Sequence, residues 1–411
     1  MIPTYSQSTV DIPRMWPILP YDIIVQIIDT VGEDKDLLKE LALVSHSFHE
    51  ICCKHLFATV ELYEPNPFRR ITSRKKSFVN LLKSRPDVIK YIRKLTYKVS
   101  RYDDDDFRLS HILPKFLRTI SCLNYLTIDG SSLNWNSREM DPSLRSALLH
   151  LMHLPTINHI DLSNIGNFPL SILTPCVNLL RLDIRNIKPL EEQVVMEKLP
   201  KIREFHTSNS SLLTTKLLHS IKQDGQPVFN FMDLRRLSIH FRDKQNIRHL
   251  LQNAKLLEKL HLSLVSPDQS FEGLHDILSA SACVLKVFDL SLSLYPGINL
   301  RLEGFCDALE TMAGRNMLEA LSLEVNVYRY MTADTIGSFI QSVEKILVKP
   351  GWPALRKVSF KVPVAYYVED EDFAKELARK LQFLLPDTYL SHLSKLESVA
   401  LNVSSYAFKH P

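Results

Sequence analysis

Glycine is scarce in this sequence, with 10 residues among 411, about a third of the ordinary share of roughly 7%. Loops that hold phosphate groups need clustered glycines, because their backbone N–H groups must come close to the anion. The sequence contains neither the G-x-G-x-x-G nor the G-x-x-x-x-G-K-[ST] pattern. A nucleotide-dependent enzyme of a common type is therefore not expected.

Long apolar runs are also missing. No run approaches the ~18 residues that cross a bilayer, and Asp11, Arg14 and four prolines lie within the first twenty residues, where a secretion signal needs an apolar centre. The six cysteines are scattered, and the only close pair, Cys52 and Cys53, is vicinal. This usage is typical of reduced thiols. The sequence therefore predicts a cytoplasmic or nuclear protein without a membrane partner.

The charges show no strong excess of either sign. The 50 basic and 46 acidic residues leave a formal charge of +4, whereas binding to nucleic acid or an anionic membrane needs more charge or charge gathered on one face. Basic residues concentrate only between Arg69 and Arg101, where they alternate with apolar residues at helical spacing and precede an acidic run at 103–106. We interpret this segment as a solvated helix face, with a phosphate- or import-receptor-binding patch as the alternative. No nucleic-acid partner is expected.

One phrase recurs along most of the chain: an apolar residue, two mostly polar residues, an apolar residue, a polar residue and an apolar residue. Its copies lie at residues 92–97, 123–128, 157–162, 179–184, 202–207, 234–239, 257–262, 285–290, 318–323, 355–360 and 396–401. The alternation that ends each copy predicts a strand with one buried face. Several of the intervening segments carry apolar residues at helical spacing. The chain is therefore expected to alternate strand and helix about eleven times.

A repeat of one strand and one helix every 20–50 residues or so is typical of a solenoid. The pattern resembles leucine-rich repeats over roughly residues 88–403. The asparagine usual at one place in such repeats is replaced by Ile165 and Ile187, and Asn164 and Asn186 come one residue earlier, so an unbroken asparagine ladder is not expected. The predicted fold is an α/β solenoid of irregular repeats, with parallel strands and with helices on the convex side. A doubly wound sheet is the alternative.

Three short amphipathic helices are predicted ahead of the repeats. Pro20 suits the start of the first helix, because its missing N–H is not needed there. Asp34 or Asp36 can cap the second helix, and Ser47 with Glu50 has the spacing of a capping box for the third. Roughly forty residues of this kind rarely stand alone. Their apolar stripes are expected to pack partly against something else, and one candidate is the open end of the solenoid.

The phrases LPYDIIVQII and DLLKELALVSHSF in this segment are similar to the F-box, with Phe48 where tryptophan is most common and Val31 where leucine is. The resemblance implies that this surface binds the Skp-family adaptor of a cullin-RING ubiquitin ligase, while the C-terminal domain selects a protein substrate. The implied domains are a leader at 1–14, an F-box-like helical domain at 15–62 and a leucine-rich-repeat-like substrate-binding domain at 63–411. The residues expected to contact the adaptor are Leu19, Pro20, Ile23, Ile24, Ile27, Ile28, Leu41, Val44, Ser45 and Phe48.

The polar residues between the buried leucines of each strand should line one continuous surface of a parallel solenoid. The predicted substrate-facing residues are Asp161, Asp183, Arg185, His206, His240, His261, Asp289 and Glu324. A partner with a basic segment would suit the acidic early strands, and the histidines would make binding depend on pH between about 6 and 7. The alternative is an ordinary solvated sheet face.

A metal or catalytic site was also considered. His49, Cys52 and Cys53 share one face of a helix, a conceivable zinc site, but Cys52 also shares a stripe with Phe48 and Leu56, where a thiol packs as a small apolar group. The sequence has no nucleophile elbow and no H-E-x-x-H phrase. No metal, cofactor or enzymatic activity is expected. The first hypothesis is a ubiquitin-ligase substrate receptor; the others are a repeat scaffold with a helical cap and an enzyme site within inter-repeat insertions.

Overall fold

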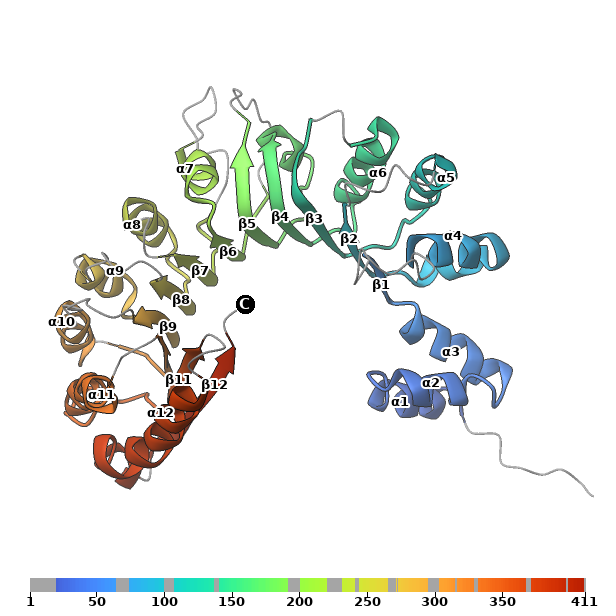
Figure 1. Cartoon of the computed structure of the whole chain (residues 1–411). Helices are drawn as coiled ribbons and strands as arrows, with labels where there is room; N and C mark the ends of the chain where they lie inside the picture. The colour runs from blue at the N-terminus through green and yellow to red at the C-terminus, as the bar shows by residue number, and fades with distance from the viewer. Residues whose placement is uncertain are drawn as a thin grey trace, which may run out of the picture.

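The chain forms one arch, with strands along its inner side and helices along its outer side (Figure 1). The computed structural model describes residues 20–63, 74–99, 107–136, 140–190, 200–219, 231–240, 244–264, 271, 273–294, 303–314, 316–328, 332–366, 371–396 and 398–409. The predicted leader at 1–14 and Leu19 lie outside this part of the chain. Within it, no helix combines the length and apolar character that crossing a bilayer requires.

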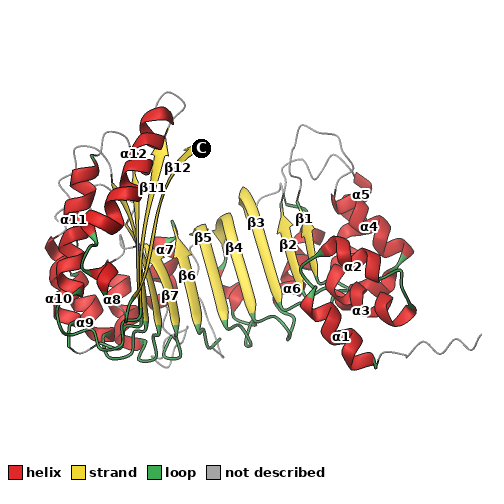
Figure 2. Ribbon diagram, turned by 90° about the horizontal axis from the view of Figure 1, so that it is seen from below, coloured by secondary structure: helices red, strands yellow, loops and turns green. Residues whose placement is uncertain are grey.

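One sheet of twelve parallel strands follows the order of the sequence (Figure 2). The strands are β1 (Thr59–Leu62), β2 (Lys94–Lys98), β3 (Tyr125–Asn134), β4 (His159–Phe168), β5 (Arg181–Pro189), β6 (Glu204–Ser208), β7 (Arg236–His240), β8 (Lys259–Leu264), β9 (Val287–Leu294), β10 (Ala320–Val327), β11 (Lys357–Tyr366) and β12 (Ala400–Lys409). A doubly wound sheet would change direction in its strand order, and this sheet does not. The fold is solenoid-like, consistent with leucine-rich repeats.

Every predicted phrase overlaps one of the strands β2 to β12. The phrases place apolar side chains on the face of each strand that packs against the helices, and Leu126, Ile160, Leu182, Phe205 and Leu237 are all buried in register on successive strands. Full burial of such a side chain contributes about 1.5–3 kcal/mol. β1 has no such phrase, yet it pairs with β2 and begins the sheet.

Helices cover the convex side of this sheet. They are α4 (Arg74–Ser84), α5 (Phe107–Leu117), α6 (Pro142–Met152), α7 (Ser211–His219), α8 (Lys244–Asn253), α9 (Leu274–Ser281), α10 (Glu303–Met312), α11 (Ala333–Leu347) and α12 (Glu371–Leu384), with shorter helical turns at η1 (Pro86–Tyr91), η3 (Leu170–Leu173), η5 (Leu385–Tyr389) and η6 (Leu393–Lys395). Their apolar residues join those of the strands in one continuous core. Each repeat therefore buries its apolar surface mainly against its neighbours.

Asn164 and Asn186 lie where β4 and β5 leave the regular pleat. Both have a left-handed backbone, with φ of 56° and 53°, a region that asparagine tolerates better than most residues. Each adds one outward residue, so the following Ile165 and Ile187 still enter the core. Asn186 Nδ2 donates to Asn164 Oδ1 at 3.0 Å, and Asn164 Nδ2 donates to Asp129 Oδ1 at 3.0 Å. The displaced asparagines thus form a short ladder across three strands.

The three N-terminal helices, α1 (Tyr21–Thr30), α2 (Lys35–Leu41) and α3 (His46–Leu56), form a separate cluster beyond α4 at one end of the arch (Figure 1). Their small core contains Ile24, Ile28, Leu38, Ile51 and Cys52, and it is distinct from the core of the solenoid. Part of their apolar surface is thus buried among the three helices themselves.

The caps of these helices agree only partly with the sequence prediction. Asp34 Oδ1 accepts hydrogen bonds from the backbone N–H groups of Asp36 and Leu37 at 3.1 and 3.0 Å, so Asp34 caps α2. For α3 the predicted capping box at Ser47 is wrong. Ser45 has an extended backbone, and its Oγ accepts from the Phe48 N–H at 3.4 Å. The helix therefore begins two residues earlier than the box would allow.

Candidate functional site

A row of contacting side chains crosses the concave face over β2 to β7. The parallel register aligns Lys94, Tyr125, His159, Arg181 and Glu204 on neighbouring strands, which lie about 4.8 Å apart. The Lys94 ammonium lies 4.3 Å from the centre of the Tyr125 ring. The Tyr125 and His159 rings stack with their centres 3.8 Å apart and an angle of 6° between their planes. Side chains that are distant in the sequence thus fill this part of the face.

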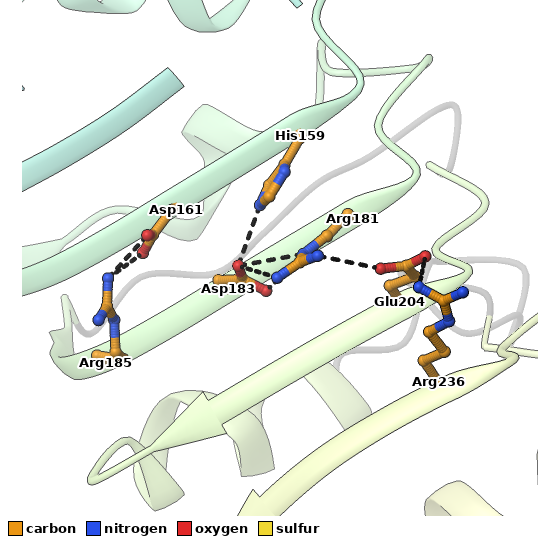
Figure 3. A network of polar contacts seen from close by, with 7 residues as sticks. All are labelled: His159, Asp161, Arg181, Asp183, Arg185, Glu204 and Arg236. Carbon is orange, nitrogen blue, oxygen red and sulfur yellow. Dashed lines mark hydrogen bonds and ion pairs between the residues drawn. The ribbon is translucent and has the colours of Figure 1, made fainter. Parts of the chain in front are cut away.

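Charged groups continue the row, as Figure 3 shows. His159 Nε2 donates to Asp183 Oδ2 at 3.0 Å, and Arg181 donates to the same carboxylate oxygen at 3.0 Å. Arg181 also reaches Glu204 at 3.3 Å, and Arg236 binds the other oxygen of Glu204 at 3.1 Å. Each of these carboxylates is therefore shared between two partners.

Asp161 and Asp183 face the concave side, as predicted, but little of either residue is open to solvent. Arg185 donates to both carboxylate oxygens of Asp161, at 2.7 and 3.0 Å. Each aspartate is only 6% exposed, whereas the side chains of Arg181 and Arg185 are close to half exposed. A partner approaching these strands therefore meets guanidinium groups before carboxylates, which differs from the acidic surface that the sequence suggested.

The contacts around Asp183 also set its protonation. Burial raises the pKa of this carboxyl group, but the hydrogen bonds from His159 and Arg181 and the charge of Arg181 outweigh burial. The pKa of Asp183 consequently lies below its ordinary value, and the group is ionised at neutral pH.

The predicted histidines lie on neighbouring strands of the concave face. His206, His240 and His261 lie half-buried on β6, β7 and β8. Burial lowers the pKa of His206 and of His261 below its ordinary value, because the charged imidazolium loses hydration there. These two rings therefore gain charge at a more acidic pH than a fully hydrated histidine does.

The remaining predicted substrate-facing residues lie on the later strands. Asp289 on β9 pairs with Lys259 on β8 at 2.9 Å. Glu324 on β10 is half-buried, next in register to Lys361 on β11. The predicted residues therefore do not converge on one site, and they spread over strands β4 to β10.

The helical cluster carries several exposed apolar side chains. Ile23 and Ile27 on α1 are 40% and 39% exposed, Leu43 and Val44 between α2 and α3 are 87% and 65% exposed, and Tyr21 is about half exposed. The sequence prediction missed Tyr21 and Leu43. The sequence could have indicated that Leu43 is exposed, because Leu43 lies outside the helical spacing that relates Leu37, Leu38, Leu41 and Val44.

The other residues predicted to contact an adaptor divide by burial. Pro20 and Ser45 are exposed, and Leu41 and Phe48 are partly buried. Ile24 and Ile28 are buried in the core of the cluster. The broad isoleucine stripe of α1 therefore has an inner edge that holds the helices together and an outer edge that is open.

The cysteine and histidine residues of α3 do not form a metal cluster. Cys52 is buried in the helical core, and Cys53 Sγ lies 3.5 Å from His49 Nε2. Across the part of the chain that the structure describes, no group of three or more histidine, cysteine, aspartate or glutamate residues is arranged to hold a metal ion. Much of the inter-repeat sequence in which an enzyme site was considered, such as 191–199 and 295–302, lies outside that part.

Comparison with known proteins adds little. No protein-family model and no curated protein matches the chain. Among solved structures, a Bacteroides fragilis protein is similar with 12% sequence identity and a TM-score of 0.38, over 83% of this chain and 86% of that protein. We draw nothing on family or function from this likeness.

Proposed function

We propose that the protein is an F-box protein with leucine-rich repeats that serves as the substrate receptor of a cullin-RING ubiquitin ligase. In this proposal α1 to α3 bind the Skp-family adaptor, and the solenoid binds a protein substrate. The protein acts by holding the substrate near the ubiquitin-transfer machinery, so its contribution is proximity and not bond-making by its own side chains. It needs no cofactor for this role, and its place is the cytoplasm or the nucleus.

The observation that carries the proposal is the exposed apolar surface of the helical cluster. Tyr21, Ile23, Ile27, Leu43 and Val44 are left in water although their neighbours form a core. Exposed groups of large apolar side chains are typical of protein-binding surfaces. A surface of this kind suits the apolar contacts that the F-box resemblance implies.

The alternative is a repeat scaffold in which the helices only cap the solenoid. A cap turns its apolar surface toward the repeat that it covers. Leu62 on β1, Phe78 on α4 and Val88 on η1 already belong to the core of the solenoid. Those elements supply the end of the repeat array, which leaves the outer apolar residues of α1 unexplained by a capping role.

The test is to truncate the exposed residues and spare the buried ones. Ile23→Ala with Val44→Ala should weaken binding to the adaptor at least about a hundredfold, because central apolar residues of an interface commonly contribute about 2 kcal/mol each. Calorimetry with purified adaptor measures the affinity, and circular dichroism checks that the fold is kept. Ile24 is unsuitable for this test, since it is buried in the helical core.

A matched control removes two exposed apolar side chains elsewhere. Val177 and Leu212 are about half exposed on the solenoid, so Val177→Ala with Leu212→Ala should leave adaptor binding unchanged. The proposal fails if the wild-type protein does not bind the adaptor, or if the two double variants bind it equally well.

A further inference from the structure

A hollow of about 420 Å³ lies in the concave face over β8 to β12, at the other end of the arch from α1. Small side chains create it. The register places Ala320 and Ala400 on either side of Lys357, and Ser322 and Asn402 on either side of Ser359. The positions of β3 to β7 that align with Ala320 carry larger side chains, namely Tyr125, His159, Arg181, Glu204 and Arg236, of which Figure 3 shows the last four. The concave face is therefore filled over its early strands and hollow over its late ones.

Two lysines of β11 flank this hollow. Lys357 and Lys361 stand two residues before and two residues after Ser359, so all three side chains point to the concave face. Both lysines are exposed. Among the described residues that line the hollow, Asp289 is the one carboxylate, and Lys259 holds it at 2.9 Å. Three lysines and one aspartate in this described lining leave a formal excess of two positive charges.

Neither of these lysines is neutralised in the way that Arg181, Arg185 and Arg236 are. Glu324 is the register neighbour of Lys361 on β10, but within the described residues no ion pair of 4 Å or less joins them. The charges over β3 to β7 satisfy one another, whereas those over β11 remain open to an incoming anion. Positive charge in a concave site also raises the local concentration of anionic groups.

We propose that this hollow binds a phosphorylated serine or threonine within an extended segment of a partner protein. If the proposed function is correct, that partner is the substrate, and the inference rests on that function for this identification. A phosphorylated side chain carries a charge of about −1.5 to −2 at neutral pH and three acceptor oxygens. Lys357 and Lys361 supply the opposite charge, and the hydroxyls of Ser322, Ser359 and Ser404, which also line the hollow, supply further donors. A carboxylate offers one charge and two oxygens, and so uses fewer of these groups.

The test measures binding of short fluorescent peptide pools to the purified full chain by polarisation. The pools are randomised on both sides of a fixed residue, which is phosphoserine, serine or glutamate. The phosphoserine pool should bind at least about tenfold more tightly than the other two. Lys357→Ala with Lys361→Ala should remove that preference. Ser359→Asp, which places a carboxylate between the lysines, should remove it as well.

A matched control removes two positive charges outside the hollow. Lys286 and Lys345 are exposed and do not line it, so Lys286→Ala with Lys345→Ala should keep the preference. Equal binding of the three pools, or equal loss in both double variants, would overturn the inference. Tight binding of inositol hexakisphosphate, measured alongside, with no preference among the peptides would also overturn it.

The proposed receptor function and the proposed phosphoserine binding in the hollow can be disproved independently of each other. The peptide measurement contains no adaptor, and the Lys357→Ala, Lys361→Ala variant should bind the adaptor as the wild type does. If the wild-type protein shows no phosphoserine preference but binds the adaptor normally, only the proposed role of the hollow is disproved. A kept phosphoserine preference with no adaptor binding would support the hollow and remove the receptor role.

Discussion

Asp183 shows how a single residue of the concave face is built into the fold. Its outward direction follows from the alternation of β5, but its partners come from the neighbouring strand and from its own strand, namely His159 on β4 and Arg181 two residues before it. A carboxylate placed here without partners would lose hydration without compensation. The ion pair and the hydrogen bonds are therefore what allows the charge of Asp183 to be nearly buried on the concave face.

Asp183→Asn should lower the free energy of unfolding by about 1–2 kcal/mol at neutral pH, because the charge-assisted hydrogen bonds are lost. The folded-state pKa of Asp183 lies below its ordinary value, so its stabilisation is fully present above the unfolded-state pKa of about 3.9 and is lost as the pH falls through the lower folded-state value. Urea unfolding at neutral pH and near pH 3 should show the difference between wild type and variant shrinking in acid.

The control for this change is Asp307→Asn on α10, an exposed aspartate, whose substitution should change stability by less than about 0.5 kcal/mol. A difference for Asp183→Asn that stays the same at both pH values would contradict the role assigned to its ionisation.

At the scale of an element, helix α1 has an apolar face that is wider than the area that α2 and α3 cover. The sequence predicts one apolar face on this helix, formed by residues at i, i+1, i+4, i+5 and i+8, namely Ile23, Ile24, Ile27, Ile28 and Val31. In the structure Ile24 and Ile28 pack inside the cluster, while Ile23 and Ile27 stay about 40% exposed. Helices α2 and α3 pack against only one edge of the stripe, the edge that carries Ile24 and Ile28, so tertiary packing decides which edge is covered.

Ile28→Ala should destabilise the helical cluster by about 2–4 kcal/mol, because it removes buried methyl groups and leaves a cavity. Since this core is separate from that of the solenoid, hydrogen exchange followed by mass spectrometry should show protection lost in α1 to α3 and kept in β2 to β12. Ile27→Ala on the same helix is the matched control and should change exchange little. Equal effects of the two substitutions would show that the burial of Ile28 is not what holds the cluster.

At the scale of the whole molecule, stability is distributed along a line. Each strand pairs only with the strands next to it in the sequence order, so the sheet behaves as a chain of nearest-neighbour interfaces. The β6–β7 pair has three residues in register, from Glu204 with Arg236 to His206 with Ser238, the shortest pairing in the described sheet. This joint is where the arch should separate most easily.

Leu237→Ala, in the buried row of β7, should cost about 2–4 kcal/mol and concentrate the loss at this joint. Hydrogen exchange should increase most in β6, β7 and β8, while β2, β3, β10 and β11 keep most of their protection. Leu162→Ala, equally buried on β4, should instead move the loss to β3, β4 and β5. Uniform loss along the whole arch in both variants would contradict nearest-neighbour behaviour.

The sequence by itself determined the repeat architecture. The apolar alternation at each phrase is a local property, because a strand with one buried face must alternate whatever its neighbours are. It therefore predicted β2 to β12 and the buried apolar residues of these strands. It also predicted that Asp161, Asp183 and His206 point away from that core. It also predicted a helical segment ahead of the repeats, whose function remains a proposal.

Only the tertiary structure decided which outward side chains meet. Contacts such as Arg185 with Asp161 join residues 24 positions apart and depend on the register between β4 and β5, which the phrase does not encode. The same holds for β1, whose four residues gain strand form by pairing with β2. The hollow beside Lys357 and Lys361 follows from small residues on adjacent strands. A cavity is a property of several segments at once, so no single stretch of the sequence could show it.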